Sequence, residues 1–385
     1  MQGIRGFLYI STMTAPNSQR FLALDVLRGM TVCFMIIVNT PGSGASPFSP
    51  LEHASWHGFT PTDLVFPTFL FVVGNAMAFA MKKFSNMSNS QVIWKILKRT
   101  LIIFLLGYLM YWFPFVRESA SGGLEFSPFS DTRIPGVLQR IGICYGIAAM
   151  MIYFLPKRMV WIFSIIFLLG YWLVLYLGGD YTMTGNLGIR IDKLLLGENH
   201  MYHGEGIAFD PEGVLSTIPS VVNVIIGYYA GVFIREKGNT YETVAKLMIA
   251  GAVLVAIAYF WNLSFPINKK LWTSSFVFYT CGLAMIILGV LIYWIELAGK
   301  RSWTYFFEVF GKNPLFIYLL SEITVILLYT FSNGKGQSIY EALNLGLYQK
   351  IAPGPIGSLL FALSVMFFCW LVGWWMDRNK KYVRV

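Results

Sequence analysis

The side chains best suited to chemistry lie in one short segment, residues 53–67, which reads HASWHGFTPTDLVFP. It places two histidines, His53 and His57, and the carboxylate of Asp63 within eleven residues. An imidazole gains or loses a proton near neutral pH, and a nearby carboxylate can orient it, so this group could act as a general base. The segment is therefore the first candidate for a catalytic centre.

The same segment also has a purely structural interpretation. Thr60 or Thr62 would cap a helix that begins here, and Asp63 in its first turn would suit the positive end of the helix dipole. Trp56 would then belong to the aromatic belt at a membrane surface. Local composition leaves the catalytic and the structural interpretation open.

Composition predicts the kind of structural element that positions these residues. Hydrophobic residues make up 56% and charged residues 12% of the 385 residues, and the mean hydropathy is +0.60. A soluble domain carries about twice that share of charge. Ten apolar stretches approach the roughly 20 residues that cross a bilayer, namely 22–41, 63–81, 93–113, 137–155, 160–178, 215–234, 244–262, 272–297, 305–331 and 357–376. The sequence thus predicts an all-α, multi-pass integral membrane bundle of about ten transmembrane helices.

Residues 305–331 are the least regular of these stretches, because they contain the run Gly311-Lys312-Asn313-Pro314. A proline cannot continue the hydrogen bonding of a helix interior. The stretch predicts either one long kinked helix or a short helix followed by a true span, and eleven spans are possible in the second case.

Lysines and arginines gather on one side of this topology. With the N-terminus inside, 18 of them fall in inner segments and 8 in outer loops, which obeys the positive-inside rule. Both termini are then cytoplasmic, with residues 1–19 as a tail and 20–385 as a single transmembrane domain. The net charge of +10 lies on the inner rim. There it favours anionic lipids or an anionic cytosolic ligand and requires no nucleic acid.

Cysteine and histidine usage argues against a metal site. The four cysteines lie in separate apolar runs and form no CxxC motif. His200 and His203 share an outer loop, but the sequence places no third ligand beside them, so they are expected to be surface residues. The first 20 residues contain no apolar core of the kind found in a cleavable signal peptide.

A few polar residues interrupt the apolar stretches. Asp25 and Arg28 are three apart and can pair along one helical face, either near the headgroups or as a buried anchor. Asn39 lies near the outer end of the same stretch and could simply bond to a neighbouring helix. Asn313 and Glu322 are expected to join an internal polar network.

Five blocks of sequence carry a resemblance to a known family. They are the block from Asp25 to Gly74, which opens with DVLRG and contains HASWHGFTPTDLVFPTFLFVVG, and then RIPGVLQRIG, DPEGVLSTI, NKKLWTSS and GKNP. In this order and spacing they resemble the heparan-α-glucosaminide N-acetyltransferase family, including the bacterial NagX proteins (domain of unknown function 5009), within the transmembrane acyltransferase clan. The similarity covers nearly the whole chain from about residue 19.

The resemblance implies an enzyme that moves the acetyl group of cytosolic acetyl-CoA to the amino group of a terminal glucosamine across a membrane. In a bacterium this would be the inner membrane, and the sugar would receive the acetyl group at the periplasmic side. His53 matches the family's essential histidine, whereas His57 stands where the family resembles Asn. His53 would act as a base or carry the acetyl group, Asn39 would donate to the carbonyl or the sugar, and Asp63 would orient the imidazole or hold the sugar.

The other blocks supply the remaining predicted contacts. The predicted substrate contacts are Trp56, His57, Glu212, Lys269 and Trp272, and the predicted acetyl-CoA contacts are Arg28, Arg140 and Asn313. Each has a structural alternative. Arg133 could be a solvated loop charge, Arg140 could pair with an acid, Glu212 could start a helix or pair with Lys269, and Lys269 could anchor the interface.

A transporter of sugars or small metabolites is the alternative function, since it too would have about ten spans with scattered polar groups. Transporters commonly show repeat symmetry between halves, and this sequence shows no convincing internal repeat. The sequence leaves open which amino sugar is the acceptor and whether the protein forms a homodimer.

Overall fold

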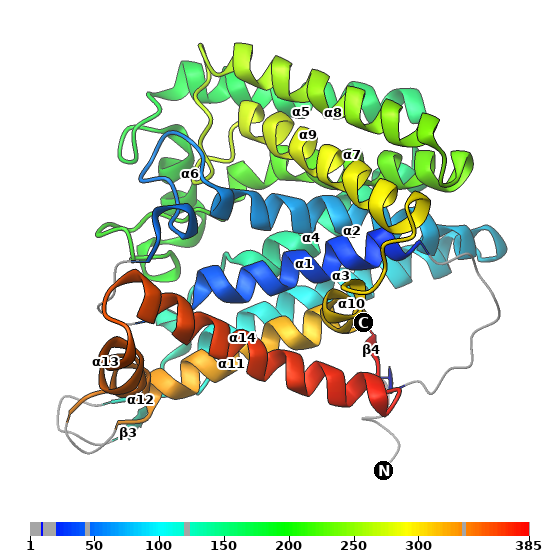
Figure 1. Cartoon of the computed structure of the whole chain (residues 1–385). Coiled ribbons are helices and arrows are strands. Elements are labelled where there is room, and N and C mark those ends of the chain that lie inside the picture. The colour runs from blue at the N-terminus through cyan, green and yellow to red at the C-terminus, as the bar shows by residue number, and fades with distance from the viewer. Residues whose placement is uncertain (1–8, 11–20, 43–46, 119–123, 333–335, 385) are drawn as a thin grey trace.

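A computed structural model describes residues 9–10, 21–42, 47–118, 124–332 and 336–384. Helices dominate it and run roughly side by side (Figure 1), which confirms the all-α prediction. The main helices are α1 (Leu22–Asn39), α2 (Val65–Ala80), α3 (Asn89–Trp112), α4 (Val137–Phe154), α5 (Lys157–Gly178), α7 (Val214–Lys237), α8 (Tyr241–Trp261), α9 (Ser274–Leu291), α10 (Thr304–Lys312), α11 (Pro314–Thr330) and α14 (Pro355–Arg378).

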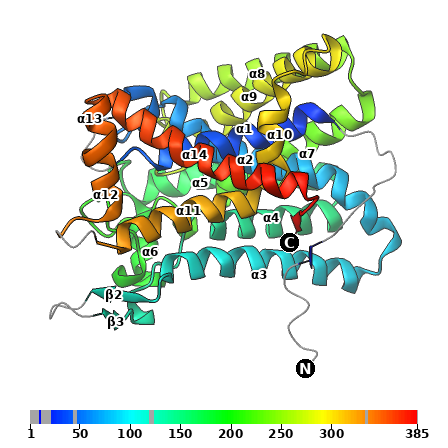
Figure 2. The same ribbon diagram turned by 60° about the horizontal axis from the view of Figure 1, so that its bottom comes forward.

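Short elements gather at one end of the bundle, which we call the outer end (left in Figure 1). They are α6 (Leu187–Leu196), α12 (Ile339–Leu343), α13 (Gln349–Ile351) and the antiparallel hairpin of β2 (Val116–Glu118) and β3 (Leu124–Phe126). The opposite end, the inner end, holds the turn between α2 and α3 and the C-terminal end of α14 (Figure 2). There β1 (Tyr9–Ile10) pairs with β4 (Val383–Arg384).

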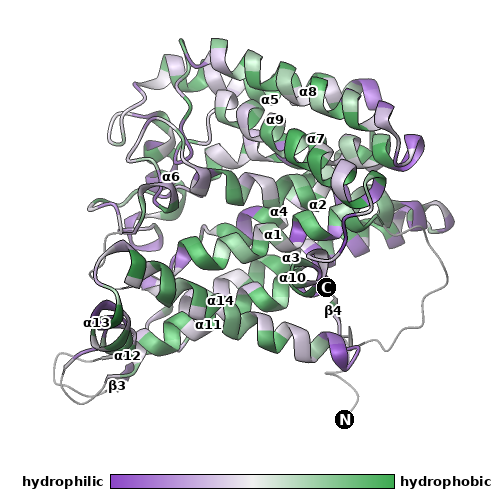
Figure 3. Cartoon of the chain, viewed as in Figure 1, coloured by the Kyte–Doolittle hydropathy of each residue, from purple (hydrophilic) through white to green (hydrophobic). Residues whose placement is uncertain are grey.

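Most of the main helices are built to cross a membrane. By length and composition, eight helices of the described residues can do so, and the bent pair of α10 and α11 would make a ninth. The 24-residue α3 is not among them, because every 18-residue stretch of it contains Lys95, Lys98 and Arg99. The middles of the helices are hydrophobic and their ends are hydrophilic, as a membrane-spanning bundle requires (Figure 3). The multi-pass prediction is thereby confirmed, but eight or nine spans qualify among the described residues where about ten were expected.

The irregular stretch 305–331 resolves into two helices. The axes of α10 and α11 differ by 84° across Asn313. Pro314 begins α11, as suits a residue that lacks the N–H needed inside a helix. The stretch is therefore a short helix followed by a longer one, and only the two together pass as a membrane span. At nine residues, α10 is too short to add an eleventh span.

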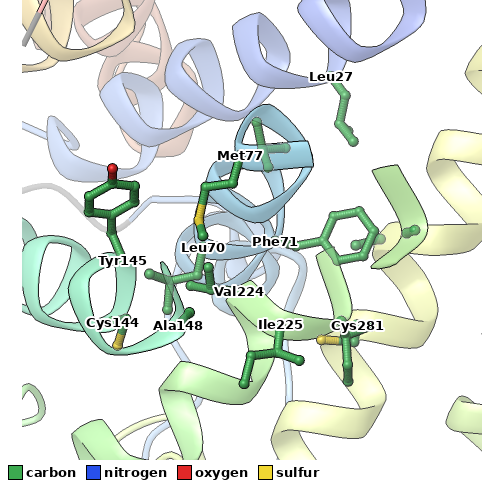
Figure 4. Packing of buried hydrophobic residues seen from close by; sticks show 14 of the residues in the cluster. Leu27, Leu70, Phe71, Met77, Cys144, Tyr145, Ala148, Val224, Ile225 and Cys281 are labelled. Atoms are coloured by element: carbon green, nitrogen blue, oxygen red, sulfur yellow. The ribbon is translucent and has the colours of Figure 1, made fainter. Parts of the chain in front are cut away.

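The core is centred where α2 packs against α7, with α4 and α9 beside them (Figure 4). Two glycines permit the close approach of α2 and α7, because a Cβ at Gly74 or Gly227 would overlap the backbone of the facing helix. Small residues are the usual contact points between membrane helices. This tight pair fixes the start of α2, on which the predicted catalytic segment depends.

Candidate active site

The predicted His–Asp pair is formed in the structure. Asp63 lies in the 3₁₀ turn Pro61–Leu64 that leads into α2, and its Oδ1 is 2.7 Å from Nδ1 of His53. Its Oδ2 accepts hydrogen bonds from the backbone N–H groups of Ala54, at 3.1 Å, and Thr60, at 3.0 Å. The carboxylate is fully buried and is therefore held in place on both sides. A carboxylate at Nδ1 stabilises the tautomer whose Nε2 lone pair can accept a proton.

Lys269 completes this pair from a distant part of the chain. Its Nζ lies 2.9 Å from Nε2 and 3.0 Å from Nδ1 of His53, and 3.9 Å from Oδ1 of Asp63. The loop that carries Lys269 is folded around Asn268, whose Oδ1 accepts from the N–H of Leu271 at 2.8 Å. The lysine that was predicted as a substrate contact thus lies against the candidate base itself.

Burial shifts the titration of both groups. It lowers the pKa of His53 below 6.5, although the hydrogen bond to Asp63 opposes this shift. Burial also lowers the pKa of the Lys269 ammonium to about 8, with the Asp63 charge acting in the opposite direction. At neutral pH the imidazole is therefore a free base, and the lysine beside it is still mainly charged.

These groups line a cavity of about 380 Å³ at the outer end of the bundle, which we call the outer cavity. Its wall includes polar residues from three α-helices, one 3₁₀ turn and four loops: Asn39, His53, Asp63, Tyr111, Arg133, Tyr202, Glu205, Glu212, Lys269, Lys270, Tyr318 and Glu322. Of the predicted site residues, the fold brings five together here, namely Asn39, His53, Asp63, Glu212 and Lys269.

Arg133 organises the opposite wall of the outer cavity. Its Nε and Nη2 bind the two carboxylate oxygens of Asp210 at 2.9 and 2.7 Å, and Nη2 lies 2.7 Å from Glu212. The rings of Tyr111 and Tyr202 flank the guanidinium at 5.0 and 4.8 Å. The interpretation of Arg133 as a solvated loop charge is therefore wrong, and Glu212 pairs with Arg133 rather than with Lys269.

A second cavity, of about 660 Å³, lies towards the inner end, and we call it the inner cavity. It is lined by Asp25 and Arg28, which form the expected pair, and by Arg99 and Lys312. Five helices, α1, α2, α3, α4 and α11, contribute to both cavities. On α4, Val137 lines the outer cavity and its neighbour Leu138 the inner one. The linings of the two cavities therefore adjoin.

A smaller pocket of about 290 Å³ shares Arg99 and Tyr145 with the inner cavity. It adds the cations of Lys83, Lys95 and Lys98. The guanidinium of Arg99 stacks on Tyr145 at 4.6 Å. Within the described part of the chain, no carboxylate lies within ion-pair distance of any of these four cations. Such a cluster favours an anionic ligand.

Two predicted site residues lie beside the outer cavity without lining it. Trp56 donates from Nε1 to the carbonyl of Tyr181 at 2.7 Å and packs on Phe209, so it holds the loop in place. His57 is exposed, with Nδ1 3.3 Å from the amide of Asn268.

The other predicted contacts are structural neighbours of the site. Arg140 is buried, stacks 4.8 Å above the ring of Trp272 and bonds to Ser216. Neither Arg140 nor Trp272 lines the cavities described above. Asn313 donates to the carbonyl of Lys381 at 3.1 Å and accepts from the N–H of Val383, so it anchors the C-terminal strand beside the inner cavity.

Five polar cavity residues, Tyr111, Tyr202, Glu205, Lys270 and Tyr318, carry no individual prediction from the sequence. Lys270 pairs with Glu205 at 2.7 Å in the cavity lining. Lys270 follows Lys269 directly, so the Asn-Lys-Lys motif was an available signal. The three tyrosines carried no comparable signal, because isolated tyrosines are common at membrane surfaces.

Comparison with known proteins finds similarity to the same family that the five sequence blocks resemble. Residues 20–196 match a family model described as heparan-alpha-glucosaminide N-acetyltransferase, catalytic. The mouse heparan-alpha-glucosaminide N-acetyltransferase is 29% identical over 370 residues, covering 80% of this chain and 54% of its own length. The human protein of that name is 29% identical over 365 residues, covering 79% and 53%. The chain thus spans about half the length of the curated relatives it matches. The matched family segment contains His53 and Asp63, while Lys269 and Glu322 lie beyond it.

Proposed function

We propose, from the premise that this chain resembles the heparan-α-glucosaminide N-acetyltransferases over most of its length, that it is a membrane-embedded acetyltransferase. It moves the acetyl group of acetyl-CoA from the inner face to the amino group of glucosamine or a terminal α-glucosaminide at the outer face. In a bacterial cell the inner face is the cytoplasm and the outer face the periplasm. A homodimer in the cytoplasmic membrane is compatible with this function.

The observation that carries the proposal is the stacking of the two cavities along five shared helices. The outer cavity holds an imidazole beside a fixed carboxylate, and the inner cavity adjoins four cations that have no acidic partner in the described part of the chain. Acetyl transfer across a membrane requires this combination, because the charged donor stays on one side while its acetyl group reaches a base on the other.

The donor fits the inner side by its chemistry. Acetyl-CoA carries several phosphate charges, and Lys83, Lys95, Lys98 and Arg99 offer cations without acidic partners among the described residues. The inner cavity adds Arg28 and apolar walls from α2 and α4 that suit an uncharged arm. The predicted contact Asn313 would support this side indirectly, through the C-terminal strand, whereas Arg140 lies in the first turn of α4 and bonds to Ser216 near the start of α7.

His53 then performs the proton transfer. In direct transfer, the acceptor amine attacks the thioester carbon, Nε2 takes the amine proton, the C–S bond breaks, and the proton passes to the leaving thiolate. In the two-step form, Nε2 attacks the thioester carbon, the C–S bond breaks and CoA leaves as the thiolate. The amine then displaces the imidazole from the acetyl carbon, and the amine proton passes through Nε2 to the thiolate. In both, the Lys269 ammonium and the Asn39 amide can donate to the carbonyl oxygen as its charge develops.

A labelling experiment tests the proposal. Purified protein in detergent is incubated with glucosamine and acetyl-CoA labelled in the acetyl group, and the sugar is analysed by mass spectrometry. We expect labelled N-acetylglucosamine and one free CoA per product. A transporter would carry the sugar across a vesicle membrane unchanged. If several amino sugars are tested and each is transported but none acquires the label, the acetyltransferase proposal is refuted.

A further inference from the structure

The charges of the outer cavity are unevenly balanced. Four carboxylates line it, and three of them have a basic side-chain partner at 2.7 Å: Asp63 with His53, Glu205 with Lys270, and Glu212 with Arg133. The fourth, Glu322, lies within ion-pair distance of no cation among the described residues.

Neutral donors hold the Glu322 side chain instead. The Asn39 amide donates to Oε1 at 3.1 Å, and the Tyr318 hydroxyl, one helical turn away, donates to the same carboxylate. Glu322 is seven residues beyond Leu315, which lines the inner cavity, so it lies about 10 Å along α11 from that cavity. An ionised carboxylate at this depth is costly without a counter-ion, and in membrane proteins such a residue commonly marks a ligand site.

We propose that Glu322 is the acceptor-amine site of the outer cavity, where its carboxylate binds the ammonium group of the incoming amino sugar and takes its first proton. The inference rests on the proposed function, which requires a cationic acceptor to become a neutral nucleophile. Asn39 and Tyr318 act as positioning residues that aim the carboxylate into the cavity.

The proton balance then divides between two groups. The ammonium gives one proton to Glu322 and becomes a neutral amine, whose lone pair forms the C–N bond to the acetyl carbon. The C–S bond breaks, its electrons leave with the thiolate, and the second amine proton passes through His53 to that thiolate. Glu322 releases the first proton to water in the outer cavity. The amide product has no charge, so it loses the ion pair and can leave.

This arrangement predicts selectivity for amines over hydroxyls, and Glu322→Gln tests it. The variant keeps the size and the hydrogen bonds but removes the charge. We expect kcat/KM for glucosamine to fall at least about tenfold, as for loss of a hydrogen bond to a charged group. Acetylation of methoxyamine, which is uncharged at neutral pH, should change less than about threefold. The matched control is Glu242→Gln, on the exposed first turn of α8. Wild-type selectivity in Glu322→Gln, or an equal loss with both nucleophiles, would overturn the proposal.

A binding measurement separates this inference from the proposed function. Without acetyl-CoA, wild-type protein in detergent at pH 7 should bind glucosamine at least about tenfold more tightly than glucose, and Glu322→Gln should lose that preference. Amine-selective binding without acetyl transfer would refute the enzyme but retain the amine site. If Glu322→Gln does not fold, competition on the wild type decides: cyclohexylamine should displace glucosamine and cyclohexanol should not. Equal displacement would refute the amine site.

Discussion

At the scale of single residues, the two ring nitrogens of His53 have different surroundings. Nδ1 meets a buried carboxylate, while Nε2 faces the cavity and the Lys269 ammonium. About 43% of the His53 side chain is exposed. The residue therefore contributes little to packing, and its substitution should affect chemistry more than folding.

We expect His53→Ala to lower turnover by about 100-fold to 10,000-fold, the range for loss of a general base. The measurement is acetylation of glucosamine by the purified variant, with size-exclusion chromatography to verify folding. His57→Asn is the matched control, since His57 is exposed and outside the cavity lining, and it should keep much of the activity. A folded His53→Ala protein with a near wild-type rate would place the base elsewhere.

The charge of Lys269 predicts how the acetylation rate should depend on pH. If its ammonium stabilises the transition state, the stabilisation is complete below its pKa of about 8 and is lost above it. An arginine in its place stays charged throughout this range. The ratio of the Lys269→Arg rate to the wild-type rate should therefore rise between pH 7 and pH 9, and titration of the acceptor amine cancels from this ratio. A ratio that stays constant with pH would remove Lys269 from the charge stabilisation.

At the scale of elements, the Arg133 cluster joins two loops. Arg133 precedes α4, whereas Asp210 and Glu212 precede α7, so their ion pairs hold the outer ends of these helices together. Asp192 reinforces this corner by accepting the N–H of Val214, the first residue of α7, at 2.8 Å. Burial raises the pKa of Asp192 to about 6.

Arg133→Met should destabilise the protein by about 3–5 kcal/mol, because it leaves two nearly buried carboxylates without their cation. The check is the thermal unfolding midpoint in detergent. Arg190→Met, which removes an exposed arginine from α6, should leave the midpoint nearly unchanged. Equal midpoints for the two variants would contradict the structural role of the cluster.

At the scale of the whole molecule, orientation follows from the charge split of 18 inner to 8 outer basic residues. We expect a cysteine at Ser88, the N-cap of α3, to be protected from an impermeant maleimide in intact cells. Cysteines at Ser127 or Gly204, at the outer end, should react. The four native cysteines are buried, which keeps the background low. Labelling at position 88 with protection at 127 would reverse the orientation.

The sequence by itself determined the features that depend on near neighbours along the chain. Helix positions follow from apolar runs, since a lipid environment requires backbone hydrogen bonds to be satisfied within each segment. The pairing of His53 with Asp63 could be anticipated because ten residues and a helix start separate them. The break at Asn313 followed from Pro314.

Only the tertiary structure decided which distant residues meet. Lys269 is 216 residues from His53, and Glu322 is 283 residues from Asn39, so no local pattern relates them. The sequence allowed Glu212 to pair with Lys269, but the packing of α4 and α7 placed Arg133 beside it instead. The two cavities are likewise properties of five helices together. Their positions depend on side-chain packing between helices, which apolar periodicity leaves undetermined because membrane helices are largely apolar on all sides.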